Sequence, residues 1–592
     1  MDLHFTSDAP TDAERGAVDD ALGRDGDAAA GTAARSRRHL LLPVLHALQD
    51  RIGWISPGAL NYAGRRLDVA PADAYGVATF YALFSTTPRA PRVVHVCDDI
   101  ACIFAGAESL CVTLESTFGP PGTHGEGGET TWLRSPCLGL CDRAPAALVT
   151  VAGDVPSARQ IAPVHAHGLT ALMATGARGG EPAAPHVGGS ELRLLRRVGK
   201  TDPESLDDYR AHGGYRALRE AFELGPQGVI AEVQASNLLG RGGAAFPTGR
   251  KMEAVASAPE RPHYLVCNAD ESEPGTFKDR ILIEYDPYAI VEAMTIAAYA
   301  IGCERGFVYI RGEYPRATQR LSNAITQARR HGLLGDDVMS RGMRFDIEIR
   351  RGAGAYICGE ETALFNSIEG KRGEPRSKPP FPVQAGLFGK PTQINNVETL
   401  ANLPLILLEG GAAYARAGTP GSTGTRLFCL SGAIERPGLY EVPHGTTLGA
   451  LVELAGGVAQ EARLQAILLG GAAGVMVSPD ALSMPLTFED ARAANATLGS
   501  GVVMLFDESV DLVGILRRIA RFFRDESCGQ CVPCRVGTVR QEEALERRDV
   551  VLLDEIGRAM RDASICGLGQ TAASVIASAQ TNLKILAARA AQ

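Results

Sequence analysis

Eight of the thirteen cysteines fall into two groups whose spacing is typical of iron–sulfur ligands. Two pairs, with the spacings C-x4-C and C-x3-C, occupy residues 97–102 and 137–141. Three cysteines with the spacing C-x2-C-x2-C occupy residues 528–534, and a fourth follows at residue 566. Thiolates paired on two loops can hold a bridged [2Fe–2S] centre, whereas three on one loop with a distant fourth suit a cubane [4Fe–4S] centre. The expected ligands are Cys97, Cys102, Cys137 and Cys141 for the first centre, and Cys528, Cys531, Cys534 and Cys566 for the second.

Two other interpretations of these cysteines stay open. Zinc is the alternative metal, although zinc sites more often use two separated C-x2-C pairs. In the second alternative, the cysteines of the first group are small core residues. Disulfides are not expected, because the chain shows no secretory signal, and the high cysteine count then favours metal or redox chemistry. The other five cysteines lie in apolar contexts typical of the core, and only Cys358 is a candidate neighbour of a cofactor. These five are Cys111, Cys267, Cys303, Cys358 and Cys429.

A glycine-rich run at residues 240–251 is followed by an acidic run at residues 268–275. Glycines let backbone N–H groups approach an anion closely, and Lys251 at the end of the first run can meet a phosphate. The acidic run offers acceptors for a ribose or an amide. The two runs therefore suggest a nucleotide-like cofactor between them. Glycine-rich loops are also common as plain turns, so the runs alone leave both interpretations open.

Composition narrows the class of protein. A length of 592 residues predicts roughly four domains, and 45% apolar residues can fill several cores. The net charge of −9 and the pI of about 5.8 argue against a nucleic-acid binder. No uninterrupted apolar stretch is long enough to cross a bilayer. We therefore expect a soluble cytoplasmic protein without membrane insertion.

The expected domains follow from composition and periodicity along the chain. Residues 1–36 contain almost no large apolar side chains and are expected to form a flexible tail. The apolar pattern of residues 37–171 predicts a helical unit followed by a small α/β unit. In this α/β unit, a strand at residues 92–97 ends at Cys97. The remaining expected segments are a linker at 172–200, an α/β domain with a largely parallel sheet at 201–420, a small α+β module at 421–506 and a helical domain at 507–592.

Further motifs add to these runs: GAGAYICGEET at residues 352–362, KPPFP at 378–382 and INNVET at 394–399. Together with the cysteines they resemble the NADH-oxidising flavoprotein subunit of respiratory complex I and its soluble relatives. In this chain that flavoprotein part would be joined, at its N-terminus, to the small thioredoxin-like ferredoxin subunit. The resemblance covers about residues 38 to 580. It implies a multidomain α/β fold with a helical unit and a thioredoxin-like ferredoxin domain, a Rossmann-like FMN/NADH domain, a small β-grasp (ubiquitin-like) domain and a C-terminal helical bundle.

The resemblance also implies which residues bind FMN and NADH. The implied FMN residues are Gly240, Arg241, Gly242, Gly243, Lys251, Asn268, Asp270, Glu271, Tyr356, Gly359, Glu360, Asn395, Asn396 and Thr399. The implied NADH residues are Phe246, Glu273, Glu361, Lys378 and Phe381. Two positions depart from the family: Ala245 stands where it usually has glycine, and Met252 where it often has tryptophan. We expect FMN to bind nevertheless, with its ring slightly displaced at most.

The implied chemistry explains why these cofactors occur together. NADH gives up two electrons as a hydride, whereas an iron–sulfur cluster accepts one electron at a time, and a flavin can do both. The protein positions the two rings and holds the phosphates, so no catalytic acid, base or nucleophile is expected. The C-terminal cluster would exchange electrons between FMN and a partner subunit. In the family, the N-terminal cluster lies off the main electron path.

The fused layout, with its motifs at residues 208–215 and 560–570, is most similar to the beta subunit of molybdenum- or tungsten-dependent, NAD-linked formate dehydrogenases. The alternatives are the diaphorase subunit of an NAD-reducing hydrogenase or of complex I. The formate dehydrogenase implies a partner subunit that carries molybdenum or tungsten and handles formate, and the hydrogenase implies a module that handles hydrogen, in both cases with further iron–sulfur clusters. The non-enzymatic alternative is a zinc-binding scaffold in which the glycine-rich loops are only turns.

Overall fold

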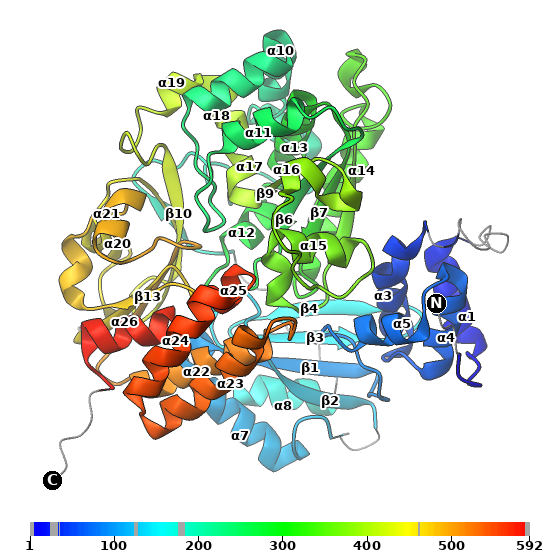
Figure 1. The fold of residues 1–592 in the computed structure, drawn as a ribbon, viewed down its shortest axis with the longest axis vertical. Helices are drawn as coiled ribbons and strands as arrows, with labels where there is room; N and C mark the ends of the chain where they lie inside the picture. Colours follow the sequence, from blue (N-terminus) through cyan, green and yellow to red (C-terminus); the bar gives the residue numbers. More distant parts are fainter. Residues whose placement is uncertain are drawn as a thin grey trace. The chain divides into compact units, whose positions relative to one another are not determined.

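The computed structural model describes residues 5–23, 34, 36–123, 128–175, 184–459 and 462–586. The chain divides into two compact units. Figure 1 shows its helices and strands, coloured along the sequence. The first unit contains the chain up to residue 182 and the segments 309–315 and 350–376. The second unit contains the rest, including the glycine-rich run and the C-terminal cysteines. None of the described helices combines the length and the apolar composition needed to cross a bilayer.

The first unit begins with helices. They are α1 (Asp12–Leu22), α3 (Leu41–Ile52), α4 (Pro57–Leu67) and α5 (Pro71–Ala78). The prediction of a flexible tail over residues 1–36 is wrong for α1. Thr11 and Glu14 form a reciprocal capping box at its start, and Val18 is fully buried where α1 packs on α3. Residues 1–4, 24–33 and 35 of the predicted tail lie outside the described residues.

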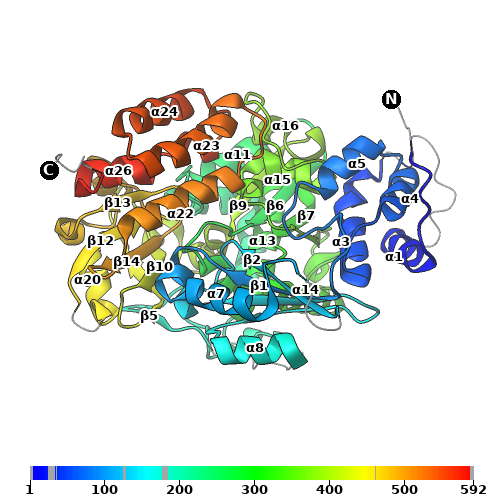
Figure 2. The same cartoon turned by 90° about the horizontal axis from the view of Figure 1, so that it is seen from below.

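A four-stranded sheet completes the first unit, in the order β2 (Thr130–Ser135), β1 (Arg92–Cys97), β3 (Ala147–Val151), β4 (Ser157–Ile161). Strand β1 is parallel to β2 and antiparallel to β3, and it delivers Cys97 at its end as expected. The short helix α6 (Ile100–Phe104) follows β1. Helices α7 (Ala107–Phe118) and α8 (Ala166–Thr175) cover one face of the sheet, around a core that includes Val94, Val96 and Trp132 (Figure 2).

The predicted linker at residues 172–200 contains regular structure at both ends. Helix α8 extends to Thr175, and the strand β5 (Val187–Gly189) pairs in parallel with a later strand of the second unit, β11 (Gly438–Pro443). Glycine and proline content therefore misled this prediction: Gly188 and Gly189 are needed because added side chains would collide with Tyr440 and with the backbone of Glu441. Residues 176–183 are outside the described part.

The α/β domain of the second unit is built on a four-stranded sheet. Its order is β8 (Asp346–Arg351), β7 (Cys303–Ile310), β6 (His263–Ala269), β9 (Thr392–Asn396), and β6 and β9 are parallel. Helix α13 (Pro287–Ile301) is buried along almost its whole length. Its other principal helices are α9 (Leu206–Ala211), α10 (Arg216–Ala235), α11 (Thr248–Ala256), α12 (Lys278–Tyr285), α14 (Pro315–Arg330), α16 (Pro382–Ala385), α17 (Val397–Ala401), α18 (Leu403–Glu409) and α19 (Gly411–Tyr414).

Two further modules follow in the second unit. A six-stranded sheet has the order β13 (Val475–Val477), β12 (Leu464–Leu469), β14 (Val502–Asp507), β10 (Thr425–Gly432), β11, β5, and carries α20 (Leu448–Leu454) and α21 (Phe488–Ala493). The C-terminal helices are α22 (Leu512–Asp525), α23 (Val532–Arg547), α24 (Val550–Ala563), α25 (Gly567–Thr571) and α26 (Ser574–Leu583). Ser578 and Asn582 of α26 hydrogen-bond to the backbone of Met476 in β13, which fixes the helices to the sheet (Figure 1).

A buried carboxylate anchors the segment that leads into the α/β domain. Glu292 on α13 accepts hydrogen bonds from the Tyr209 hydroxyl at 2.6 Å and from the backbone N–H groups of Tyr215 and Leu218 at 2.7 and 3.0 Å. It therefore caps α10 in place of a local side chain. The glycine at residue 214 is required because a Cβ there would lie 2.1 Å from the ring of Tyr209. The motif at residues 208–215 therefore contains residues that pack and hydrogen-bond around the Glu292 cap of α10.

We expect Glu292→Ala to destabilise the second unit strongly, because it leaves three buried donors without an acceptor. The cost should be about 3 kcal/mol or more. Thermal unfolding of the variant should occur well below that of the wild type, whereas Glu304→Ala, on the exposed part of β7, should unfold with the wild type. Equal unfolding temperatures for Glu292→Ala and the wild type would contradict this role.

Candidate functional site

The parallel pair β6 and β9 brings three predicted cofactor residues to one edge of the sheet. Asn268 is the register partner of Asn396, and Cys267 that of Asn395. Because the strands are parallel, their carboxyl ends meet at the same edge, which is where ligands bind in open α/β sheets. The acidic run follows β6 directly, and α17 follows β9. Two sequence motifs more than one hundred residues apart therefore border one site.

The glycine-rich loop closes on itself beside this edge. Leu239 bridges Pro247, and the N–H of Gly240 donates to the carbonyl of Phe246 at 3.0 Å. A Cβ added to Gly242 would lie 3.1 Å from the Cβ of Asn396, so the loop backbone approaches that residue closely. Gly242 and Gly243 are exposed. The loop leads into the first turn of α11, and this arrangement is typical of a phosphate cradle.

Ala245 adopts a left-handed backbone conformation, with φ of 52°. Glycine takes up this conformation without the steric cost that a Cβ imposes. The sequence departure at this position therefore keeps the backbone shape of a glycine while adding a half-buried methyl group. The other departure, Met252, is fully buried on α11.

Lysine and phenylalanine side chains surround the loop. The Lys251 Nζ donates to the carbonyl of Ile394 at 3.0 Å and lies 5.7 Å from the centre of the Phe246 ring. Phe246 is 53% exposed and Phe381 is 52% exposed, although large apolar side chains are usually covered. Phe381 directly precedes α16, which packs against α11. Lys378 is exposed. The second unit thus presents two accessible aromatic rings on neighbouring elements.

Arg241 has a different role from the one expected of its side chain. Its guanidinium is fully buried, lies 2.8 Å from Nε2 of His444 and donates to the carbonyls of Thr423 and Thr425 at 2.8 and 3.2 Å. Its backbone N–H donates to Oγ1 of Thr399 at 2.8 Å. Arg241 therefore ties the glycine-rich loop to β9–α17 and to the six-stranded module. The sequence could not distinguish this from a cofactor contact.

The carboxylates of Glu271 and Glu273 in the acidic run accept hydrogen bonds from backbone N–H groups of the protein. Glu271 accepts from the N–H groups of Asp279 and Arg280 at 2.9 and 3.0 Å and so caps α12. Burial raises the pKa of Glu271 to about 7, and the charge of Asp279 adds to the effect. Glu273 accepts from the N–H of Ala473 at 2.8 Å, and burial raises its pKa. Asn268 accepts from the N–H of Asp270 at 3.1 Å, which closes a turn.

A buried lysine, which sequence analysis did not select, lies behind these residues. The Lys278 Nζ contacts Asp279 at 2.8 Å, Glu398 at 3.1 Å and the Asn396 amide oxygen at 3.1 Å. Asn396 also donates to Asp279 at 2.6 Å and caps α17. In the sequence, the only indication of this role is that Lys278 follows the acidic run. From sequence alone, an isolated lysine at such a position is expected to lie on the surface.

Three buried polar atoms of uncharged side chains at this site make no hydrogen bond among the described residues. They are Thr248 Oγ1 at the start of α11, Ser272 Oγ in the acidic run and Gln393 Oε1 on β9. Buried polar atoms are normally satisfied, and those without a protein partner commonly bind a ligand or water. Together with the exposed glycines, they show that the residues of this edge fit a polar nucleotide such as FMN.

The other four predicted residues belong to the first unit and are described there. Tyr356 and Gly359 bound a short 3-10 helix. Glu360 caps α15 (Glu361–Ile368), accepting from the N–H groups of Thr362 and Ala363 at 2.8 and 2.9 Å. Glu361 is the first residue of this helix and is half-buried. The Glu360 carboxylate is therefore used as a helix cap.

The four N-terminal cysteines converge in the first unit. The Sγ atoms of Cys137 and Cys141 are 3.4 Å apart, and hydrogen bonds with the Cys102 and Cys137 thiols raise the pKa of Cys97. Asp99 joins the two loops, because its carboxylate accepts from the N–H of Ile100 at 2.9 Å and from that of Cys137 at 3.2 Å. All four cysteines are buried. The two pairs thus form one thiol cluster.

The segment 309–315 clamps the second cysteine loop. The buried Arg311 donates to the carbonyl of Cys137 at 2.6 Å and pairs with Glu313 at 2.8 Å. A Cβ on Gly139 would lie 2.1 Å from the hydroxyl of Tyr314, and Gly139 has φ of 68°. Both Arg311 and Tyr314 lie far from the cysteines in sequence. Sequence analysis missed them because nothing in the local pattern after β7 points to a cysteine loop.

Three of the C-terminal cysteines lie where α23 and α25 begin. Cys531 and Cys566 are the residues before these helices, and Cys534 is buried in the first turn of α23. A Cβ on Gly569 in α25 would lie 2.9 Å from that of Cys534, so the first turns of the two helices pack tightly. Burial raises the pKa of Cys534 to about 11. Among the described residues, no three His, Cys, Asp or Glu side chains are arranged as ligands of a metal ion, so the cluster ligands stay a prediction.

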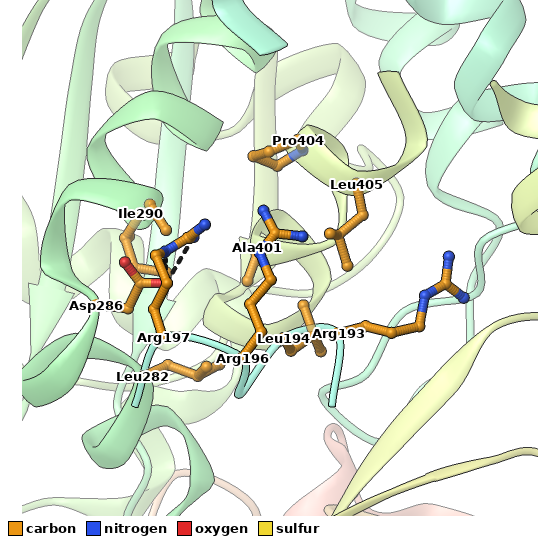
Figure 3. A pocket seen from close by; sticks show the side chains of 11 residues that line it. Arg193, Leu194, Arg196, Arg197, Leu282, Asp286, Ile290, Ala401, Pro404 and Leu405 are labelled. Atoms are coloured by element: carbon orange, nitrogen blue, oxygen red, sulfur yellow. Dashed lines mark hydrogen bonds and ion pairs between the residues drawn. The ribbon is translucent and has the colours of Figure 1, made fainter. Parts of the chain in front are cut away.

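A small pocket elsewhere in the second unit is not a nucleotide site. Its volume is about 10 Å³, enough for one water molecule. Figure 3 shows Arg197 paired with Asp286 and the neighbouring Arg196 extending toward Pro404. The Arg197 guanidinium also lies 4.8 Å from the centre of the Tyr209 ring. These contacts secure the segment that precedes α9.

Comparisons with known proteins match each part of the chain. The family models are the Nuo51 FMN-binding domain at residues 233–405, the thioredoxin-like [2Fe-2S] ferredoxin at 28–159, the SLBB domain at 427–479 and the NADH-ubiquinone oxidoreductase-F iron-sulfur binding region at 514–584. A subunit of the NADH-quinone oxidoreductase of Rhizobium meliloti is 46% identical over 64% of this chain and 93% of its own length. The chain belongs to this family of NADH-oxidising FMN and iron–sulfur subunits.

Other members of the family match more of the chain. The NAD-reducing hydrogenase HoxS subunit alpha of Cupriavidus necator is 37% identical over 91% of this chain and 89% of its own length. A crystal structure of NAD+-reducing [NiFe]-hydrogenase contains a chain with a TM-score of 0.80 and 33% identity, covering 92% of both chains. The multidomain α/β fold is thereby confirmed, and so is the cofactor set: FMN, NAD(H), a [2Fe–2S] and a [4Fe–4S] cluster.

Glu271 predicts a specific pH dependence of stability. Its folded pKa of about 7 lies above its usual value of 4.5. The folded chain therefore binds more protons than the unfolded chain between these values, so stability falls as the pH rises through this window, by at most about 3 kcal/mol. Glu271→Gln should remove this fall in stability. The melting temperature of the variant, relative to that of the wild type, should therefore rise from pH 5 to pH 8. Parallel pH profiles would contradict this, and the exposed Glu253→Gln serves as control.

Arg311 predicts an effect on the N-terminal cluster. Its positive charge at the Cys137 carbonyl favours the more negative, reduced state of a bound cluster. Arg311→Gln removes that charge and leaves Glu313 unpaired, so the reduction potential should fall by about 60 mV or more, a tenfold change for one electron. A redox titration followed by EPR measures it. Arg305→Gln, on the exposed part of β7, should leave the potential unchanged, and an unchanged potential in Arg311→Gln would overturn this role.

Proposed function

We propose that the chain is a diaphorase subunit that exchanges hydride between NAD(H) and FMN and single electrons with iron–sulfur clusters. The observation that carries the proposal is the edge formed by β6 and β9, where the glycine-rich loop lies against Asn396. FMN bound there would convert two-electron into one-electron transfer. No side chain has to act as acid, base or nucleophile.

The residues of this edge would bind and orient the cofactors. The exposed backbone of Gly242 and Gly243 would receive the FMN phosphate, with Lys251 as the nearby cation. Phe246 and Phe381 offer accessible ring faces on which NADH would stack. Lys278 and Arg241 would hold the loop and the two strand ends in place. The buried thiols around Cys97 would ligate [2Fe–2S] and those around Cys534 would ligate [4Fe–4S].

The partner would supply the second substrate, and we propose the molybdenum or tungsten subunit of a cytoplasmic, NAD-dependent formate dehydrogenase. The fused layout and the motifs at residues 208–215 and 560–570 support this choice. The second candidate is a hydrogenase module. The observation that favours it is the similarity to the HoxS subunit alpha over 91% of the chain.

Purified protein should contain extractable FMN and show the broad visible absorption of iron–sulfur clusters, and it should reduce a dye with NADH. Cys534→Ser should lose the EPR signal of the cubane cluster and electron transfer to the partner, while the signal of the N-terminal cluster remains. Colourless, zinc-loaded protein without NADH-dependent dye reduction would refute the proposal and support a metal-binding scaffold.

The partner is tested separately by isolating the native complex. Reduction of NAD+ by formate, with molybdenum or tungsten in the preparation, would support the formate dehydrogenase assignment. Reduction of NAD+ by hydrogen, with nickel present and no response to formate, would refute it in favour of the hydrogenase. Neither outcome alters the test of the diaphorase activity.

A further inference from the structure

In the first unit, the face of the sheet that α7 and α8 do not cover borders a cavity of about 200 Å³. Side chains alternate along β1, so Val94 and Val96 point into the core under α7 and α8, whereas Val93 and His95 point to the other side. There they face helix α3 across the cavity. In β3, Leu148 is the register partner of His95. The cavity therefore lies on the face of the sheet opposite α7 and α8. It is separate from the cysteine cluster.

Most charged and polar groups of the cavity wall are paired with each other. Arg351 donates to Asp50 at 2.6 Å and to Nδ1 of His46 at 2.7 Å. The Nε2 of His46 bonds the carbonyl of Arg351 at 3.1 Å. Gln49 accepts from the N–H of Ser85 at 2.9 Å and donates to the carbonyl of Gly53. These groups need no ligand.

Among the charged and imidazole side chains of the wall, Arg89 and His95 are the exceptions. Arg89 makes one hydrogen bond, to the carbonyl of Phe84 at 3.2 Å, and no carboxylate pairs with it in the described part of the chain. Burial lowers the pKa of Arg89. His95 is 6% exposed, and its ring makes no hydrogen bond to any described residue. A partly desolvated guanidinium without a counter-charge is costly, and an anion bound beside it would offset that cost.

The charge and the shape of the wall define the ligand. Arg89 and Arg351 against Asp50 leave one positive charge on the wall, and burial lowers the pKa of His46, which keeps that ring neutral. The rest of the wall includes the apolar side chains of Leu83, Phe84, Pro91, Val93 and Leu148. We propose that this cavity binds a small organic carboxylate, whose anionic group meets Arg89 and His95 and whose apolar body covers Leu148. Its volume is below the range of about 300–1,000 Å³ typical of drug-sized ligands, which limits the ligand to a small molecule.

Calorimetric titration of the full-length protein, with its cofactors bound, tests the proposal with three probes. Benzoate carries both a carboxylate and an apolar ring, benzyl alcohol lacks the charge, and inorganic phosphate lacks the apolar body. Benzoate should bind at one saturable site, and the other two at least tenfold more weakly. No binding of benzoate, or equally tight binding of benzyl alcohol or phosphate, would overturn the proposal.

Two variants locate the site. Arg89→Gln should weaken benzoate binding at least tenfold, because it removes the unpaired charge. Ala158→Phe fills the cavity from the exposed position on the edge strand β4 and should abolish binding while keeping Arg89. Arg463→Gln, at an exposed surface ion pair, is the matched control and should bind as the wild type does. Visible absorption and melting temperature establish that each variant is folded. Unchanged benzoate binding in both Arg89→Gln and Ala158→Phe would refute the site.

Discussion

The buried ammonium group of Lys278 is the interaction on which the flavin edge depends. It joins the start of α12 to Asn396 at the end of β9 and to Glu398 at the start of α17. Glu398 in turn accepts from the N–H of Leu427 at 3.0 Å in the six-stranded module. Removing one member of such a buried charge network leaves the others uncompensated. The edge is therefore rigid before any cofactor binds, and the exposed glycines lie on this rigid base.

Both proposed redox sites combine loops that are distant in the sequence. In the second unit, Arg241 carries the glycine-rich loop to His444 and Thr423. In the first unit, Asp99 joins the two cysteine loops and Arg311 holds the second from a segment that follows β7. In each case a charged side chain forms hydrogen bonds with buried backbone groups. Hydrogen bonds are stronger in the protein interior than in water. Rigid positioning is what electron transfer between bound cofactors requires.

The sequence predicted what depends on spacing and missed what depends on tertiary contact. The cysteine intervals and the glycine-rich loop are local patterns with few alternatives, and the family models confirmed the cofactors they imply. Lys278, Asp99 and Arg311 act through partners far along the chain, which no local pattern reveals. The predicted tail failed at α1 because a single capping box and a small buried face offset its polar composition.

The most direct test is an anaerobic titration of the purified chain with NADH, monitored by visible absorption and low-temperature EPR. The account predicts that NADH bleaches the flavin band and that the signal of a reduced cluster appears in the same titration. A protein that contains flavin and clusters reducible by dithionite, but whose spectra do not respond to NADH, would contradict the claim that this edge passes electrons from NADH to the clusters.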